Sequence, residues 1–213
     1  MNYFEIINAV LLEMNYPTVS SFADLTKIEH KRLMNIINRL NKEICSLNDR
    51  FYFRERVKML NLYPGKIEYN VNLSGKISKI IGKNFEYIYE PDYSKFFAGN
   101  DKLASYSTYG EKYLFSSEED VVRIFYSTND FVVSNNGELK ADFEVATDCS
   151  IIPNSFVEKL FINGVAYNFK QNTTHPKYIH WKNEYELALK ELVASAKKVS
   201  NINSCINGGF RKL

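Results

Sequence analysis

The side chains best suited to catalysis or metal binding are few and far apart in this sequence. Histidine occurs at His30, His175 and His180, and the three cysteines are equally scattered. No CxxC motif occurs, so the spacing favours neither a zinc site nor a disulfide framework. We interpret the histidines as structural or surface residues, and unpaired cysteines fit a reducing compartment.

Three consecutive carboxylates at Glu118, Glu119 and Asp120 could hold a cation. Adjacent residues of a strand point to opposite faces, however, so a solvated turn is the better interpretation. The sequence also lacks a dinucleotide-binding glycine motif, a P-loop, a GxSxG nucleophile and an HExxH zinc motif. These observations predict a protein that is not an enzyme and that holds no cofactor and no metal.

The charge balance argues against strong binding to nucleic acid. The sequence carries 27 basic and 25 acidic residues, a net charge of +2, whereas nucleic-acid-binding proteins usually show a clear basic excess. No apolar run reaches the roughly 18 residues of a membrane span, so we expect no membrane partner. The first residues lack a basic start and a small-residue cleavage site, so we expect no signal peptide.

Two amphipathic helices are predicted near the N-terminus. The first covers residues 3–14, with Asn2 and Glu5 as a capping box, and the second covers residues 27–47, with Thr26 and Glu29 in the same roles. The second helix has a polar, mainly basic face made by Lys31, Arg32, Asn35, Arg39 and Lys42. That face could contact DNA phosphates or an acidic partner, or it could simply be solvated.

Between residues 51 and 150 the apolar period changes from helical to alternating. We expect residues 53–60 to pair with residues 66–71 across a Pro64-Gly65 turn, and residues 77–81 to pair with 85–89. A second hairpin is predicted across Thr128-Asn129, followed by an Asn-Gly turn at Asn136-Gly137. The intervening Tyr-rich stretch, residues 91–113, is long enough to be a functional loop.

Two further helices are predicted in the C-terminal part. Ser155 and Glu158 form a third possible capping box, and the apolar residues that follow predict the most buried helix of the protein. Gly164 in its middle is expected where another backbone approaches closely. A last helix should run from after Pro176 to about Ser200. The end of the chain is expected to be flexible or to dock on a partner through Phe210, Arg211, Lys212 and Leu213.

The predicted fold class is therefore α+β. A four-helix scaffold, with two N-terminal and two C-terminal helices in residues 1–50 and 151–200, carries a large β-rich insert in residues 51–150. Residues 201–213 form a flexible C-terminal tail. The sequence contains 15 Tyr and 15 Phe but one Trp, and Tyr suits half-buried sheets and hydrated interfaces.

In this order of elements the sequence resembles the head-to-tail adaptor proteins, also called connector or ring proteins, of short-tailed bacteriophages. Residues 5–47 resemble their opening helix pair, and residues 52–71 and 77–96 resemble the hairpin, strands and Tyr-rich segment that follow. The resemblance ends with the closing helix pair in residues 150–200. The composition, rich in Asn, Lys, Ile, Tyr and Phe, suits a crAss-like phage.

The resemblance implies a structural virion protein that is made in the host cytoplasm and placed at the portal–tail vertex. Such proteins form a ring, usually a dodecamer, beneath the portal protein, extend the channel through which double-stranded DNA passes, and provide the surface for the tail or further ring proteins. The basic face of the second helix would then dock to the portal or line the channel. The alternative function is a nucleic-acid-binding accessory protein that uses the same basic face.

Contacts from the β-rich insert to these neighbours are also implied by the resemblance. We expect them at the Pro-Gly turn and in the Tyr-rich stretch. The candidate residues are Tyr63, Pro64, Gly65, Tyr93, Phe96 and Phe97.

Overall fold

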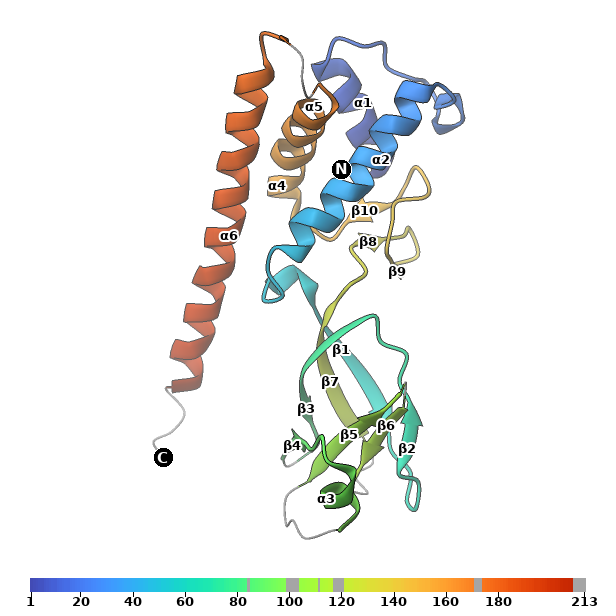
Figure 1. Ribbon diagram of the computed structural model, residues 1–213, viewed down its shortest axis with the longest axis vertical. Coiled ribbons are helices and arrows are strands. Elements are labelled where there is room, and N and C mark those ends of the chain that lie inside the picture. The colour runs from blue at the N-terminus through green and yellow to red at the C-terminus, as the bar shows by residue number, and fades with distance from the viewer. Residues whose placement is uncertain (84, 99–103, 111, 117–120, 171–173, 209–213) are drawn as a thin grey trace. The chain divides into compact units, whose positions relative to one another are not determined.

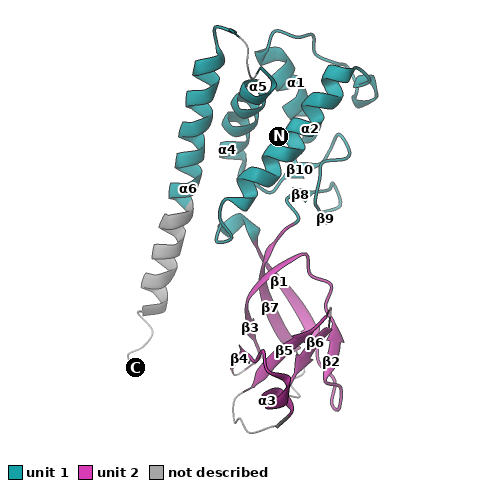
Figure 2. Cartoon of the chain, viewed as in Figure 1, with its two compact units in different colours: residues 1–54, 130–213 teal, residues 55–129 magenta. Residues whose placement is uncertain are grey.

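The chain has an α+β fold that divides into two compact units. The computed structural model describes residues 1–213 except 84, 99–103, 111, 117–120, 171–173 and 209–213, and describes only the backbone of residues 98 and 196–208. Unit 1 comprises residues 1–54 and 130–213, and unit 2 comprises residues 55–129 (Figure 2). Unit 2 is thus inserted into the sequence of unit 1.

Unit 1 is mainly helical (Figure 1). Its α-helices are α1 (Tyr3–Glu13), α2 (Ile28–Ser46), α4 (Asn154–Glu158), α5 (Gly164–Phe169) and α6 (Tyr178–Gly208). A π-helical turn, Lys159–Asn163, joins α4 to α5, and short 3₁₀ turns lie at Phe22–Asp24 and Tyr52–Arg54. The helices predicted from the apolar periodicity are therefore present, with ends that agree to within a few residues except at the C-terminal end of α6.

The predicted helix caps are only partly correct. The capping box of Asn2 and Glu5 is confirmed, because each side chain accepts a hydrogen bond from the other residue's backbone N–H at 2.9 Å. The predictions for the other two helices are wrong, since Lys27 caps α2 and Pro153 caps α4 without a side-chain hydrogen bond. The N-cap of α2 lies one residue after the expected Thr26, and the N-cap of α4 lies two residues before the expected Ser155. Each predicted Ser/Thr–Glu pair is therefore out of register with the free N–H groups at the start of its helix.

The core of unit 1 is built by α1, α2, the α4–α5 segment and α6. Fully buried side chains include Tyr3, Ile37, Phe161 and Trp181. Gly164 lies at the close approach that its position predicts, but side chains make it: a Cβ atom there would lie 2.7 Å from Tyr185 and 2.8 Å from Leu40. The prediction that another backbone approaches Gly164 is therefore wrong, because the neighbours are side chains.

A small antiparallel sheet belongs to unit 1. It contains β8 (Val132–Val133), β9 (Leu139–Lys140) and β10 (Cys149–Ser150) in the order β10-β8-β9. The predicted Asn-Gly turn between β8 and β9 is confirmed, with a φ of +80° at Gly137. The hairpin predicted across Thr128-Asn129 is wrong, because the strand before these residues lies in the other sheet.

Unit 2 is a curled sheet of seven strands with one short helix. The strands are β1 (Glu55–Asn61), β2 (Glu68–Asn70), β3 (Gly75–Ile81), β4 (Glu86–Tyr89), β5 (Ser105–Tyr109), β6 (Lys112–Phe115) and β7 (Val121–Thr128), and the helix is α3 (Tyr93–Ala98). Their order is β1-β7-β3-β4-β5-β6-β2, and all neighbours are antiparallel except β4 and β5.

The pairing of β1 differs from the prediction. The β3–β4 hairpin is confirmed, but β1 pairs along its whole length with β7, from Glu55↔Ser127 to Asn61↔Val121, and β2 pairs with β6. The turn itself is present: Lys66 N donates to Tyr63 O at 3.0 Å, and Gly65 has a φ of +74°. The Pro-Gly pair therefore turns the chain without joining a ladder, because β7 offers β1 a longer partner than the three residues of β2.

The boundaries of the inserted segment also differ from those expected. Unit 2 ends at Asn129, so residues 130–150 of the expected insert belong to unit 1. At the other end of the chain, α6 continues to Gly208 and covers most of the expected tail. The proposed docking residues Phe210, Arg211, Lys212 and Leu213 lie outside the described residues.

Candidate functional site

The predicted basic face of α2 is exposed, but Arg32, Arg39 and Lys42 already have partners within unit 1. Arg32 donates to Phe169 O at 3.3 Å and lies over the Phe169 ring at 4.8 Å, and Arg39 donates to Asn168 Oδ1 at 3.3 Å. Lys42 pairs with Asp142 at 2.7 Å. These contacts tie α2 to α5 and to the loop after β9, so much of the basic face has a structural role.

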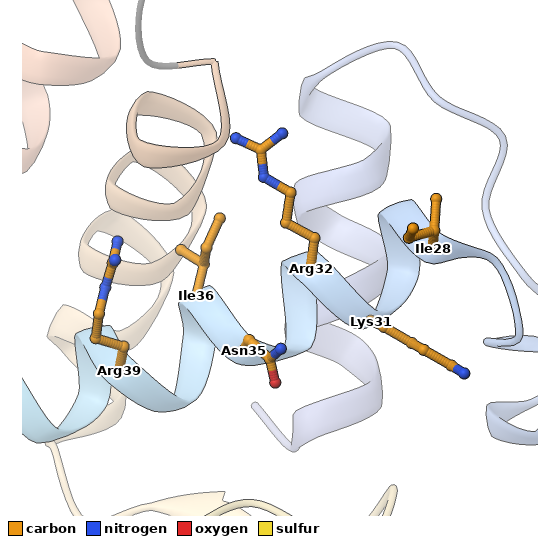
Figure 3. A pocket seen from close by; sticks show the side chains of 6 residues that line it. All are labelled: Ile28, Lys31, Arg32, Asn35, Ile36 and Arg39. Carbon is orange, nitrogen blue, oxygen red and sulfur yellow. The ribbon is translucent and has the colours of Figure 1, made fainter.

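A shallow depression of about 450 Å³ remains on this face. It is lined by Ile28, Lys31, Arg32, Asn35, Ile36 and Arg39 (Figure 3). Arg32, Ile36 and Arg39 extend from one side of α2, and Lys31 extends from another side. Lys42, the fifth residue of the predicted face, is not part of this lining. The depression combines an apolar floor at Ile36, which is buried, with cationic walls.

A second candidate surface lies on the outer face of the sheet in unit 2. Ile80, Val122 and Ile124 point inward and are buried, so the alternate residues of β3 and β7 point outward. The outward residues of β1 include Val57 and Met59, which are 51% and 63% exposed. These two residues were expected to pack in a hairpin, and their exposure follows from the pairing of β1 with β7.

The outer face is covered at one end and open at the other. The short helix α3 contacts β5, and the cross-strand pair Ser107 and Leu114 on this part of the outer face is buried. Beyond α3 the outward side chain of Ile88 in β4 is 51% exposed. Exposed apolar groups gathered on one sheet face are typical of an interaction surface.

The predicted contact residues of the insert fall into two groups. Tyr63, Pro64 and Gly65 form an exposed turn, which is held by Tyr69: Tyr63 N donates to the Tyr69 hydroxyl at 2.6 Å, and that hydroxyl lies 3.0 Å from Lys66 O. Both contacts brace the turn from inside.

The second group lies on α3. Phe97 is 63% exposed, whereas Phe96 is buried and packs edge-to-face on Phe97. Tyr93 is half-buried, because its hydroxyl donates to Thr108 O and its ring packs on Tyr109. Of this group, Phe97 offers the most surface to a partner, whereas the buried Phe96 offers little.

The most strongly held titratable groups of unit 1 have structural partners. Burial alone would raise the pKa of Asp148, but the N–H groups of Val145 and Glu144 and the ammonium of Lys140 outweigh it and hold that pKa below its usual value. Glu13 behaves similarly, since hydrogen bonds from Trp181 and Lys177 overcome the effect of burial and lower its pKa.

Neither group is arranged as part of a reactive site. Within the described ranges, no three His, Cys, Asp or Glu side chains gather in a way that could hold a metal ion. Cys45 is buried, and burial raises the pKa of its thiol to about 12, so it is not a nucleophile at neutral pH. The acidic triplet Glu118–Asp120 lies outside the described residues.

Comparison with known proteins adds no relative: neither a protein-family model nor a curated protein matches this sequence. Over the part of the chain that the structure describes, no helix has the length and apolar character needed to cross a membrane.

Sequence reasoning missed three exposed apolar residues that now mark the two surfaces. Ile28 on α2 is 79% exposed, and Met59 and Ile88 lie on the outer sheet face. The alternation of Glu86, Ile88 and Glu90 around the buried Tyr87 could have indicated the outward position of Ile88. No comparable signal existed for Met59, because its orientation depends on which strand β1 pairs with.

Proposed function

We propose that this protein is a structural virion subunit, a head-to-tail adaptor that forms a ring beneath the portal of a short-tailed phage. The ring would extend the DNA channel and provide the surface on which the tail or further ring proteins assemble. The single observation that carries the proposal is the outer sheet face of unit 2, where Val57, Met59 and Ile88 are exposed on strands of a well-packed sheet. Exposed apolar side chains on a sheet face are expected where a protein binds other subunits, and they have no stabilising role in an isolated monomer.

The division of the chain supports this assignment. In the proposed arrangement, α1, α2, the α4–α5 segment and α6 act as a four-helix scaffold that carries unit 2 as its large β-rich insert. The scaffold would contact the portal and one neighbouring copy, and the insert would contact the other neighbouring copy and the next tail component. A ring of identical subunits needs two different complementary surfaces on each copy, and one on each unit would meet that need.

The alternative, a nucleic-acid-binding accessory protein, would use Lys31, Arg32, Arg39 and Lys42. The ion pair of Lys42 with Asp142 weighs against it, because a cation already paired with a carboxylate contributes less to phosphate binding. Binding of a DNA duplex by four such cations should weaken by close to four log units per log unit of salt. We expect no duplex binding, and a slope of that size would favour the alternative.

Composition of the virion tests the adaptor directly. Particles from the source phage are purified on a density gradient and digested, and peptides of this chain are quantified against those of the portal protein by mass spectrometry. The proposal predicts a constant ratio to the portal that persists in particles from which the tail has been removed. Absence from the particle, or loss together with the capsid contents, would contradict it.

A further inference from the structure

We propose that neighbouring copies of this protein contact each other through the depression on α2 of one copy and strand β4 of the next. Ile88 of β4 would enter the depression, and Glu86 and Glu90 would pair with the cations of α2. The inference rests on the proposed function insofar as that function requires a ring of identical copies. It adds the two surfaces that meet.

The α2 surface offers a cation, an apolar floor and a second cation along one side of the helix. Arg32, Ile36 and Arg39 follow the i, i+4, i+7 spacing and extend from the same side in Figure 3. Each arginine donates to one neutral acceptor of unit 1, and a guanidinium has five N–H donors, so donors remain for a partner. Arg39 also pairs with Glu43 at 3.5 Å, but both side chains are 57% exposed, and such a pair is weak.

Strand β4 offers the complementary sequence of groups. Tyr87 points into the core of unit 2, so Glu86, Ile88 and Glu90 lie together on the outward face. The strand geometry continues to Glu90, since Glu90 N donates to Tyr106 O at 2.8 Å. The result is an acid–apolar–acid stripe whose central side chain is 51% exposed.

The two stripes also match in length. A helical rise of 1.5 Å per residue separates Arg32 from Arg39 by about 10 Å along α2. A strand rise of 3.3 Å per residue separates Glu86 from Glu90 by about 13 Å. The difference is within the reach of Arg and Glu side chains. The depression of about 450 Å³ is also large enough to receive one isoleucine side chain.

The apolar component identifies a protein surface as the occupant in preference to DNA. A duplex would satisfy Arg32 and Arg39 but would leave Ile28, which is 79% exposed, against its hydrated phosphates. A second copy of the chain supplies both carboxylates and an exposed aliphatic group at the matching spacing. Because the two surfaces differ, the contact is head-to-tail, and repetition of it closes a ring or makes a filament.

Charge reversal tests the contact in the full-length chain. Sedimentation velocity at low salt over a wide concentration range measures self-association of the wild type, of Arg32→Glu/Arg39→Glu and of Glu86→Lys/Glu90→Lys. Each double variant places like charges opposite each other and should weaken self-association by about tenfold or more. A chain that carries all four substitutions has opposite charges again, and it should recover. Mixing the two double variants should also restore association, because each supplies the surface that the other needs.

Matched controls separate this contact from general effects of charge and apolar surface. Lys76→Glu/Glu138→Lys reverses an exposed cation and an exposed acid away from both stripes and should associate like the wild type. Ile88→Arg should abolish association, whereas Met59→Arg, on the same outer face but in β1, should not. The substituted side chains are exposed or half-buried, so each variant is expected to fold. Far-ultraviolet circular dichroism checks this.

The inference would be overturned by a wild type that stays monomeric throughout, by reversals without effect, or by no recovery in the fourfold variant. Loss of association in Met59→Arg with no change in Ile88→Arg would place the contact on β1 instead. Failure of the proposed function is distinguishable from these outcomes. If the chain self-associates with the predicted rescue but is absent from the virion, the contact is supported and the adaptor function is contradicted. If the chain is present in the virion but the charge reversals show no rescue, the adaptor function is supported and the proposed contact is contradicted.

Discussion

Gly164 is the residue whose neighbours set the tightest local constraint in unit 1. A methyl group at this position would lie 2.7 Å from a Tyr185 ring carbon and 2.8 Å from a Leu40 methyl. Overpacking costs about 1–3 kcal/mol, and the gain in helix propensity over Gly is about 1 kcal/mol. We therefore predict that Gly164→Ala lowers the free energy of unfolding by up to about 2 kcal/mol, measured by urea denaturation. A more stable variant would show that α5 and α6 pack less closely.

Asp148 should make stability depend on pH in the acid range. Its folded-state pKa is lowered, so the ionised carboxylate stabilises the fold above the unfolded pKa of about 3.9. This contribution is lost as the pH falls through the lower folded-state pKa. We predict that Asp148→Asn is less stable than the wild type at neutral pH by about 1–3 kcal/mol, and that the difference shrinks in acid.

The matched control for this carboxylate is Glu144→Gln. Glu144 pairs with the same Lys140 at 3.3 Å, but its side chain is 67% exposed. Its loss should cost less than about 1 kcal/mol at any pH. Equal effects from the two substitutions, measured by thermal unfolding across a pH series, would contradict the structural role of Asp148.

At the scale of elements, the start of α6 is tied to the end of α1 by a buried indole. Trp181 Nε1 donates to Glu13 Oε1 at 2.9 Å, and Lys177 Nζ donates to the same oxygen at 3.0 Å. Glu13→Ala leaves the indole N–H without this acceptor, which costs about 1–3 kcal/mol, whereas Glu13→Gln keeps an acceptor. We predict a clearly larger loss of unfolding free energy for the alanine variant. Equal losses in urea denaturation would show that the indole bond contributes nothing.

The helices could be predicted from the sequence because their signal is local. The spacing of Ile7 and Leu11 in α1, or of Leu33, Ile37 and Leu40 in α2, reports a buried stripe without reference to the rest of the chain. The β3–β4 hairpin was predictable for the same reason, since its strands are joined by a short turn. Local signals were therefore sufficient wherever an element's partner is near in sequence or its burial is one-sided.

The partners of β1 and β7 could not be predicted in this way. Val57 lies opposite Phe125, so the pairing joins residues far apart in the sequence, and no local rule selects it over the nearer segment after Pro64-Gly65. The same limit applies to the prediction of the candidate surfaces. The basic residues of α2 were found from their helical spacing, but the exposure of Val57 and Met59 follows only from the strand order.

At the scale of the whole molecule, the two units have separate hydrophobic cores. Ile124 belongs to the core of unit 2, and Trp181 and Phe161 belong to that of unit 1. Ile124→Ala should cost about 2–5 kcal/mol. We predict that hydrogen exchange then accelerates throughout residues 55–129 and stays protected in α1 and α2. Equal acceleration in both units would show that they unfold as one.

Electron cryomicroscopy of intact particles, averaged around the tail vertex, would show whether this chain forms the proposed adaptor ring. We predict a closed ring of this chain between portal and tail, with unit 1 and unit 2 each recognisable in every subunit. A vertex whose density is fully explained by other proteins, with no ring into which these two units fit, would contradict it.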